Sequence, residues 1–166
     1  LINSIPDDKY QHVIICLTDY TDFRKRINKD VDLFALHRKE GKDFGLYFKL
    51  WRLFSELKPD IVHTRNLATL EAQFSALLAG VPCRVHGEHG RDVHDLDGTN
   101  KKYQLLRNAL RSIVDRFIPL SPDLQGYFQE KVGVPAKRIN QIYNGVDFEK
   151  FLPVYKANKK SSIPNS

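Results

Sequence analysis

Short runs of apolar, β-branched residues alternate along this chain with longer stretches that repeat apolar residues at helical spacing. The short runs end in turn residues and predict strands at residues 13–17, 32–36, 60–63, 81–88, 117–120 and 139–143. Between them, helices are predicted at residues 21–28, 44–57, 100–114 and 121–132, with another around residues 70–77 that stops at Gly80. Strands separated in this way pair in parallel through right-handed crossovers, so the pattern predicts a three-layer α/β domain.

Two elements carry more specific expectations. The run VIICL at residues 13–17 predicts a strand covered on both faces. Residues 44–57 place aromatic side chains on one helical stripe and leucines beside it, which predicts a mostly buried helix. Cys16 and Cys83 fall within predicted strands, so we expect buried free thiols and no disulfide.

Composition describes a soluble globular domain. The 166 residues are 42% hydrophobic and 28% charged, and no apolar run approaches the roughly 20 residues of a membrane span. We find no secretory leader, which favours a cytoplasmic protein. The net charge of +6 fits an anionic partner and a solubility device about equally well.

A hydrophilic, histidine-rich segment, PCRVHGEHGRDVHDLD at residues 82–97, lies where one predicted strand ends. In sheets of this kind, ligands bind in the crevice outside the carboxyl ends of the strands, so the loop from His86 to Asp97 is the first candidate site. Within it, the imidazole of His89 and the unobstructed amide of Gly90 can hydrogen-bond sugar hydroxyls or phosphate oxygens. An exposed loop histidine with a turn glycine stays open as the alternative.

Several other chemistries fit less well. The sequence has no G-x-G-x-x-G after a strand and no G-x-x-x-x-G-K-[ST], which disfavours a standard dinucleotide site and a phosphate-binding loop. Ser121 lacks the G-x-S-x-G elbow of a nucleophile and is better explained as a helix cap before Pro122. Residues 95–98 resemble part of a calcium loop, but no glutamate closes it. The potential metal ligands match no familiar zinc spacing: His86, His89, His94, Asp92, Asp95 and Asp97.

Four segments coincide with a known family. They are PDIVHTRN at residues 59–66, HGRDV at 89–93, FIPLSPDL at 117–124 and YNGVDFEKF at 143–151. Together they resemble the amino-terminal domain of family 4 retaining glycosyltransferases, two-domain enzymes of the GT-B type, with N-G-V-D-x-x-x-F as the most specific part. The strings LATLEAQ and RVHGEHGRDVHDLDG are similar to a subgroup associated with bacterial exopolysaccharide and PEP-CTERM sorting clusters.

The resemblance implies a Rossmann-like parallel sheet that is the amino-terminal half of a GT-B fold. An acceptor-side domain is then expected over residues 1–152, and a linker or the start of a donor-binding domain over 153–166. The family's first strand with its glycine-rich loop and its carboxyl-terminal donor domain are not in view, so we expect a fragment. The start at Leu1, without methionine, points the same way.

The resemblance also implies roles for individual residues. His89 corresponds to the histidine that reaches the transferred sugar and helps to stabilise charge, which makes it the predicted catalytic residue. Arg65 and Asn66 are predicted substrate contacts that could equally cap the next helix. The other predicted substrate-binding residues are Gly90, Arg91 and Asp92, and the predicted interdomain hinge, which also fits a tight turn, is Asn144 and Gly145.

The predicted function is retaining transfer of a sugar from a nucleotide-sugar donor to a growing cell-surface polysaccharide or lipid-linked acceptor. Such transfer needs electrostatic support for the departing diphosphate more than a protein nucleophile. No metal, other cofactor or nucleic acid is expected, and the fragment alone is expected to be inactive. Two alternatives stay open: a GT-B-shaped nucleotide-sugar epimerase and a non-catalytic module that binds an anionic glycan.

Basic residues gather on and after the helix predicted to begin near residue 100. Such a face either rests on anionic lipid or a lipid-diphosphate acceptor, or is simply solvated. In the first case the protein is peripheral on the inner face of the cell membrane. The residues are Lys101, Lys102, Arg107, Arg111 and Arg116.

Overall fold

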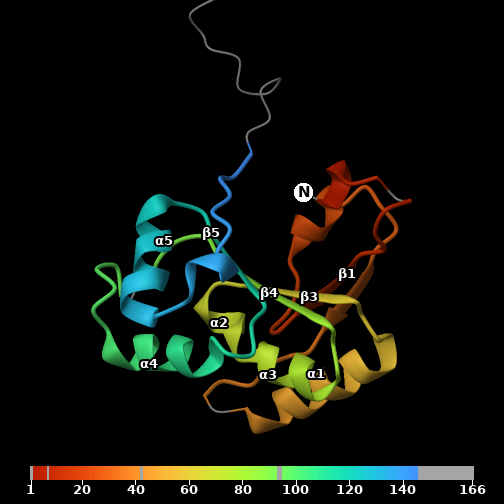
Figure 1. Ribbon diagram of the computed structural model, residues 1–166. Coiled ribbons are helices and arrows are strands. Elements are labelled where there is room, and N and C mark those ends of the chain that lie inside the picture. The colour runs from red at the N-terminus through yellow and green to blue at the C-terminus, as the bar shows by residue number, and fades with distance from the viewer. Residues whose placement is uncertain (1, 7, 42, 93–94, 146–166) are drawn as a thin grey trace, which may run out of the picture.

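The computed structural model describes residues 2–6, 8–41, 43–92 and 95–145, in which strands and helices alternate (Figure 1). The strands are β1 (Val13–Cys16), β2 (Asp32–Ala35), β3 (Ile61–Arg65), β4 (Cys83–Glu88) and β5 (Arg116–Pro119). The α-helices are α1 (Phe44–Leu57), α2 (Leu67–Leu70), α3 (Ala72–Leu78), α4 (Lys101–Leu110) and α5 (Pro122–Tyr127). Shorter turns are η1 (Ile2–Ser4), η2 (Asp22–Arg26), η3 (Phe128–Val132) and η4 (Ala136–Arg138). The predicted boundary after residue 152 lies outside the described residues.

All paired strands of the described chain run parallel, which confirms the predicted α/β class. They form two sheets: β1 pairs with β2, and β3, β4 and β5 pair in that order. The strand predicted at residues 139–143 is reduced to a single parallel bridge between Phe117 and Ile139. Polar Asn140 and Gln141 interrupt its apolar run, although the Asn140 amide still donates to the Phe117 carbonyl at 2.9 Å.

The first strand is less buried than its sequence predicted. Val13 is 37% exposed, and the other three residues of β1 are half-buried. The expectation that both faces of this strand are covered is therefore wrong for the described residues. The short helix predicted at residues 21–28 is a 3₁₀ helix, η2, at whose start the Phe23 amide donates to Thr21 Oγ1 at 3.3 Å.

Helix α1 is amphipathic, and the prediction that it is mostly buried is wrong. It starts where the Asp43 side chain accepts from the Leu46 amide at 3.2 Å, and ends at Lys58, which is left-handed with φ 48°. One face packs into the core through Leu46, Leu50 and Phe54. The opposite face is exposed, by 76% at Phe44, 62% at Phe48 and 38% at Trp51. Of the predicted aromatic stripe, Phe44, Phe48 and Trp51 therefore face outward, whereas Phe54 faces the core.

The remaining helices differ from the prediction mainly at their ends. The single helix expected before Gly80 is divided at Glu71 into α2 and α3. The predicted cap at Ser121 is confirmed, because its Oγ accepts from the amide of Leu124 at 3.2 Å and Pro122 opens α5. Helix α5 continues into the π-helical turn η3, which ends at Gly133, where φ is 76°.

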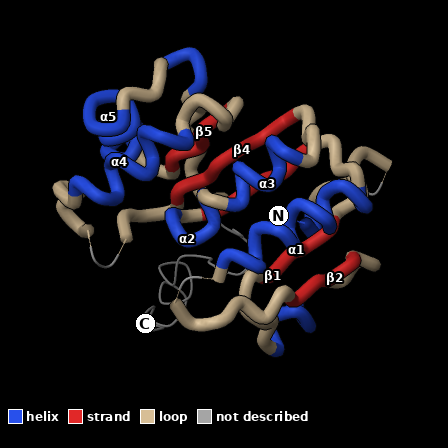
Figure 2. The backbone as a smooth tube through the Cα atoms, turned by 90° about the horizontal axis from the view of Figure 1, so that it is seen from below, coloured by secondary structure: helices blue, strands red, loops and turns tan. Residues whose placement is uncertain are grey.

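The helices pack on one face of the three-stranded sheet (Figure 2). Register places Thr64, His86 and Phe117 on this face, and all three are buried. One core cluster joins α1 and α3 to Val62, and the other joins α2, α4, α5 and η3 around Phe117. On the opposite face Ile61 is 47% exposed, so this sheet has one covered and one partly open face within the described residues.

Two further expectations concern cysteines and membrane spans. Cys16 and Cys83 are free, as predicted, but half-buried rather than fully buried. None of the helices in the described ranges combines the length and apolar character needed to cross a bilayer.

Candidate active site

Polar residues that follow β3 and β4 meet at one edge of the three-stranded sheet. β3 ends at Arg65 and β4 at Glu88, and the parallel register sets Arg65 opposite Gly87. Parallel strands end at the same edge, so Arg65, Asn66 and His89 come together there. The structure thus brings together three of the residues that the sequence selected.

Two contacts from the end of β3 hold His89 in place. Its amide donates to Asn66 Oδ1 at 2.9 Å, and its Nε2 accepts from Arg65 Nε at 2.9 Å. Arg65 Nη2 also lies 3.5 Å from His89 Nδ1, so the guanidinium borders both nitrogens of the ring. Arg65 is exposed and His89 half-buried, so both face an open surface. Asn66 makes no side-chain cap bond to α2, which favours the positioning of His89 over the helix-cap alternative.

Glycine at position 87 allows two imidazoles to approach the backbone of β4. A Cβ added there would lie 2.9 Å from His63 Nε2 and 3.7 Å from His89 Nε2. His63 was missing from the predicted site. The strand period could have found it, because burial of Val62 and Thr64 puts His63 on the same open face as Arg65.

Both imidazoles are biased toward the neutral form. Loss of water around the ring is the largest cause that lowers the pKa of His89, and the charge of Arg65 adds to it. The same two causes, in the same order, lower the pKa of His63, with smaller contributions from His86 and His89. The cluster therefore combines one permanent cation with neutral hydrogen-bonding rings at neutral pH.

We expect NMR titration of the ring protons to give His89 a pKa below the ordinary value of about 6.5. Arg65→Gln should raise that pKa only part of the way, because the burial remains. The control Arg116→Gln, which changes an exposed arginine at the start of β5, should leave it unchanged. Between the lowered folded pKa and about 6.5 the unfolded chain binds more protons, so this group makes stability rise with pH there and adds no pH dependence above it. A normal or raised His89 pKa would contradict this electrostatic picture.

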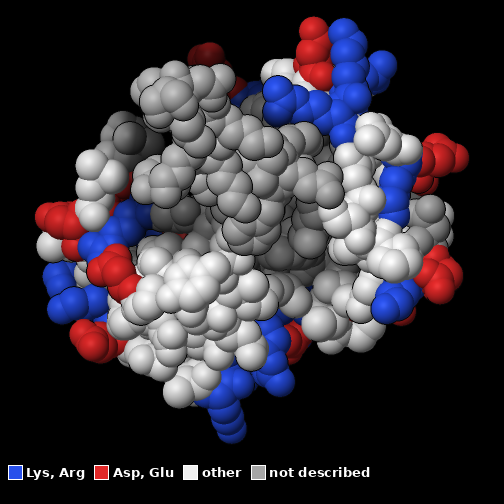
Figure 3. Space-filling view, turned by 90° about the horizontal axis from the view of Figure 1, so that it is seen from above, with Lys and Arg blue, Asp and Glu red and all other residues white. Residues whose placement is uncertain are grey.

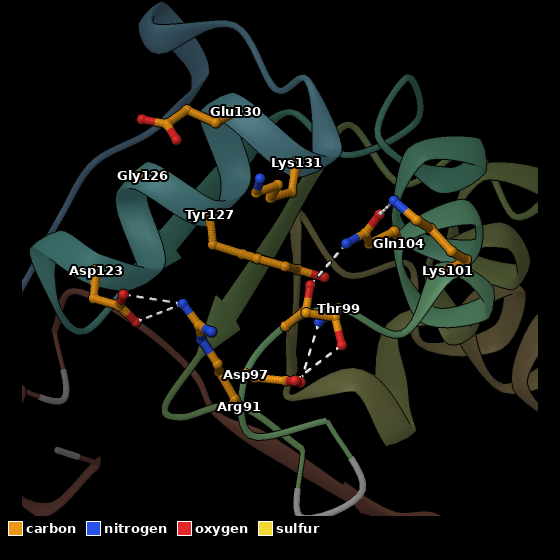
Figure 4. Close-up of a pocket in the computed structure, with 11 residues that line it drawn as sticks. Arg91, Asp97, Thr99, Lys101, Gln104, Asp123, Gly126, Tyr127, Glu130 and Lys131 are labelled. Atoms are coloured by element: carbon orange, nitrogen blue, oxygen red, sulfur yellow. Dashed lines mark hydrogen bonds and ion pairs between the residues drawn. The ribbon is translucent and has the colours of Figure 1, made fainter.

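Arg91 turns away from His89 toward α5. Its Nη2 donates to both carboxylate oxygens of Asp123, each at 2.9 Å, and its guanidinium lies 5.4 Å from the centre of the Tyr127 ring. It lines a pocket of about 360 Å³ between the 97–99 loop, the start of α4 and α5, in which Arg91 and Asp123 point toward each other (Figure 4). His89 does not line this pocket. Arg91 is therefore separated from Arg65, Asn66 and His89, with which it was predicted to bind substrate.

The other predicted site residues are placed less tightly. Gly90 is exposed directly after His89. The carbonyl of Asp92 accepts from the Asp95 amide at 2.9 Å, which forms a turn. Asn144 and Gly145 are exposed at the end of the described chain, and the rest of N-G-V-D-x-x-x-F lies outside it, so their hinge role stays a prediction.

A buried ion pair joins Glu88, the residue that precedes His89, to Arg107 of α4. Glu88 and Arg107 are 1% and 2% exposed, and Arg107 donates to both carboxylate oxygens, from Nε at 3.2 Å and from Nη2. Arg107 Nη1 also donates to the Tyr127 hydroxyl at 3.3 Å. Burial alone would raise the pKa of Glu88, but the nearby His86 ring, whose Nε2 lies 3.7 Å from Glu88 Oε2, and the hydrogen bonds from Arg107 lower it overall. This pair fixes the strand residue that precedes His89.

The predicted basic face on α4 is wrong in part, because two of its five residues are not free on the surface. Arg107 is buried and neutralised, and Arg111 is half-buried with Nη1 donating to the Val132 carbonyl at 3.0 Å. Only Lys101, Lys102 and Arg116 of that set are exposed. On the face shown in Figure 3, the described basic and acidic side chains are intermixed around the rim and do not form one basic patch.

The potential metal ligands of the histidine loop are largely engaged elsewhere. Nδ1 of the buried His86 lies 2.9 Å from Thr64 Oγ1, and Asp95 accepts from the Asn100 amide at 2.7 Å. His94 lies outside the described residues. Within the described ranges, no three His, Cys, Asp or Glu side chains lie close enough together to hold a metal ion.

Comparison with known proteins identifies the family. The Glycosyltransferase Family 4 profile matches residues 1–150. A relative from Escherichia coli, UDP-Gal:alpha-D-GlcNAc-diphosphoundecaprenol alpha-1,3-galactosyltransferase, is 30% identical over 177 residues. The alignment covers 96% of this chain but 43% of the relative, so the chain spans less than half of that protein's length. With a parallel α/β fold and a family match over most of its length, this chain belongs to glycosyltransferase family 4.

Proposed function

We propose that this chain supplies the acceptor side of a retaining glycosyltransferase that moves a sugar from a nucleotide-sugar donor to a lipid-diphosphate-linked acceptor in cell-surface polysaccharide assembly. Family membership supports the transferase class. The name of the Escherichia coli relative supports the kinds of substrate, since it specifies UDP-Gal as donor and GlcNAc-diphosphoundecaprenol as acceptor.

The pairing of Arg65 with His89 carries the proposal. Arg65 Nε donates to His89 Nε2 at 2.9 Å, and Arg65 Nη2 lies 3.5 Å from His89 Nδ1, so the guanidinium and the imidazole form one unit at the open edge of the sheet. In our proposal the imidazole of His89 contacts the transferred sugar. The Arg65 guanidinium opposes the negative charge that develops on the leaving diphosphate. Donors fixed in advance stabilise such charge more in the transition state than in the ground state, which is the condition for acceleration.

We further propose that the donor is bound mainly by a second domain, which residues 153–166 begin to reach. The 43% coverage of the relative supports this division. An enzyme with only one half of its site cannot hold donor and acceptor in reactive geometry, so the isolated chain should be inactive. Asn144 and Gly145 would then act at the hinge between the two domains.

The test compares the 166-residue chain with the product of its complete reading frame. Each is incubated with UDP-galactose and a short-chain GlcNAc-diphosphate lipid, and the product is identified by mass spectrometry and by its anomeric NMR coupling. We expect retaining transfer by the complete product only, with unchanged turnover in a metal chelator.

Other results would favour the alternatives. Conversion of the nucleotide sugar without acceptor would favour the epimerase, and salt-sensitive glycan binding without turnover would favour the binding module. Transfer by the isolated chain would overturn the proposal of a half-site.

A further inference from the structure

The exposed apolar side chains of α1 and α3 form one surface, which we call the α1–α3 apolar surface. It consists of Phe44 (76% exposed), Phe48 (62%), Trp51 (38%), Phe74 (49%), Leu77 (38%) and Leu78 (59%). The two helices lie side by side on the same face of the sheet (Figure 2), and Ser75 Oγ of α3 donates to the Tyr47 carbonyl of α1 at 2.9 Å. Six large apolar side chains on two adjoining helices exceed the scattered exposure of an ordinary surface.

Basic side chains border the aromatic part of this surface. Lys49 and Arg52 follow Phe48 on α1 and are both exposed, and Arg52 Nε donates to Glu56 Oε1 at 2.7 Å. Basic residues outnumber acidic ones by six to three over residues 38–58. Trp and Phe beside Lys and Arg on a surface helix are typical of contact with the interface of an anionic bilayer. A second copy packed on the same surface by two-fold symmetry would instead bring these like charges together.

The direction of α1 links this surface to the candidate site. The helix joins the end of β2 to the start of β3, so its first turn lies at the end of the molecule where β2 finishes. β3 runs back and ends at Arg65, beside His89, at that same end. Phe44 and Phe48 therefore lie on the half of α1 nearer the edge where an acceptor would enter.

We propose that the α1–α3 apolar surface docks on an anionic lipid bilayer and brings the open edge with Arg65 and His89 to the membrane surface. This rests on the proposed function, because a lipid-diphosphate acceptor is anchored in the bilayer by its hydrocarbon chain. The aromatic side chains enter the interface between headgroups and acyl chains. Lys49 and Arg52 stay at the level of the anionic headgroups.

Trp51 is the only tryptophan of the chain and lies within the surface, so its fluorescence reports the contact directly. The chain is mixed with phosphatidylcholine vesicles containing one third phosphatidylglycerol, and binding is followed by co-sedimentation and tryptophan emission. We expect co-sedimentation with a blue-shifted emission that weakens in high salt. Phe44→Ser with Phe48→Ser should lower partitioning about tenfold or more for each side chain removed. Leu105→Ser, which removes a 70% exposed leucine on α4, is the matched control and should leave partitioning unchanged.

Three results would overturn the proposal. The first is a Phe44→Ser/Phe48→Ser variant that binds vesicles like the parent chain. The second is co-sedimentation without a change in Trp51 emission, or co-sedimentation that is lost only in the Lys101→Glu/Lys102→Glu variant. Either outcome would place the membrane contact elsewhere on the chain. The third is a blue shift without lipid that depends on protein concentration, which identifies a second copy as the occupant. Transfer to a detergent-dispersed acceptor separates the two proposals, because that activity tests the proposed function and does not need docking.

Discussion

Replacing His89 with alanine in the complete enzyme is expected to lower kcat by about 10²–10³-fold, with a much smaller change in KM. The change removes the contact with the transferred sugar and the ring that orients Arg65 against the developing charge, and loss of one such fixed group has an effect of this size. An interaction made mainly in the transition state lowers kcat and kcat/KM together, whereas uniform binding would raise KM alone. The measurement is steady-state transfer from the proposed nucleotide-sugar donor to the proposed acceptor, with circular dichroism to show that the variant is folded.

Arg65 tests whether the two residues act as a unit. Arg65→Ala removes the guanidinium that lies 2.9 Å from His89 Nε2 and 3.5 Å from Nδ1, and so leaves the ring without the contact that orients it. The double variant should therefore be little worse than the poorer single variant. Arg116→Ala, at the opposite end of the sheet, is the control and should keep normal turnover. Near-normal turnover of His89→Ala would remove His89 from the proposed mechanism.

The sequence predicted the order of the elements well because that order depends on local patterns. Short runs bounded by turn residues located all five strands of the described chain, and Ser121-Pro122 located the start of α5. The end of β4 was placed correctly at Glu88 and that of β3 two residues early, at His63, which was still enough to bring Arg65, Asn66 and His89 to one edge. Parallel strands require this whatever the details of packing.

Burial was predicted less well, because it depends on which elements pack together. The aromatic spacing of α1 was correct, yet a helical stripe does not specify whether a core or solvent lies against it. Arg107 shows the same limit for charge. Its position on α4 predicted that Arg107 belongs to a basic surface. Its burial instead depends on a partner 19 residues earlier, Glu88. His63 was missed because the strand was predicted to end there, although the alternation along β3 puts it on the same face as Arg65.

The second large effect is expected in stability. Arg107→Met should lower the free energy of unfolding of the chain by about 3–5 kcal/mol, since it leaves the Glu88 carboxylate buried without its cation. Lys102→Met, an exposed change on the same helix, should stay within about 0.5 kcal/mol of the parent. The double variant Glu88→Leu/Arg107→Met should recover most of the loss, because a buried pair replaced by apolar residues is often neutral. Urea denaturation at pH 8 measures all three.

The pH dependence of that loss separates charge from packing. In the parent chain the pKa of Glu88 is lowered, so its contribution to stability is present above the unfolded value of about 4.3 and is lost as pH falls through the folded value. In Arg107→Met burial dominates and the pKa of Glu88 rises, so the carboxyl takes up a proton and loses its uncompensated charge as pH falls. The stability difference between variant and parent should therefore narrow from pH 8 toward pH 5. A difference that stays constant over this range would mean that Arg107 contributes by filling space rather than by neutralising Glu88.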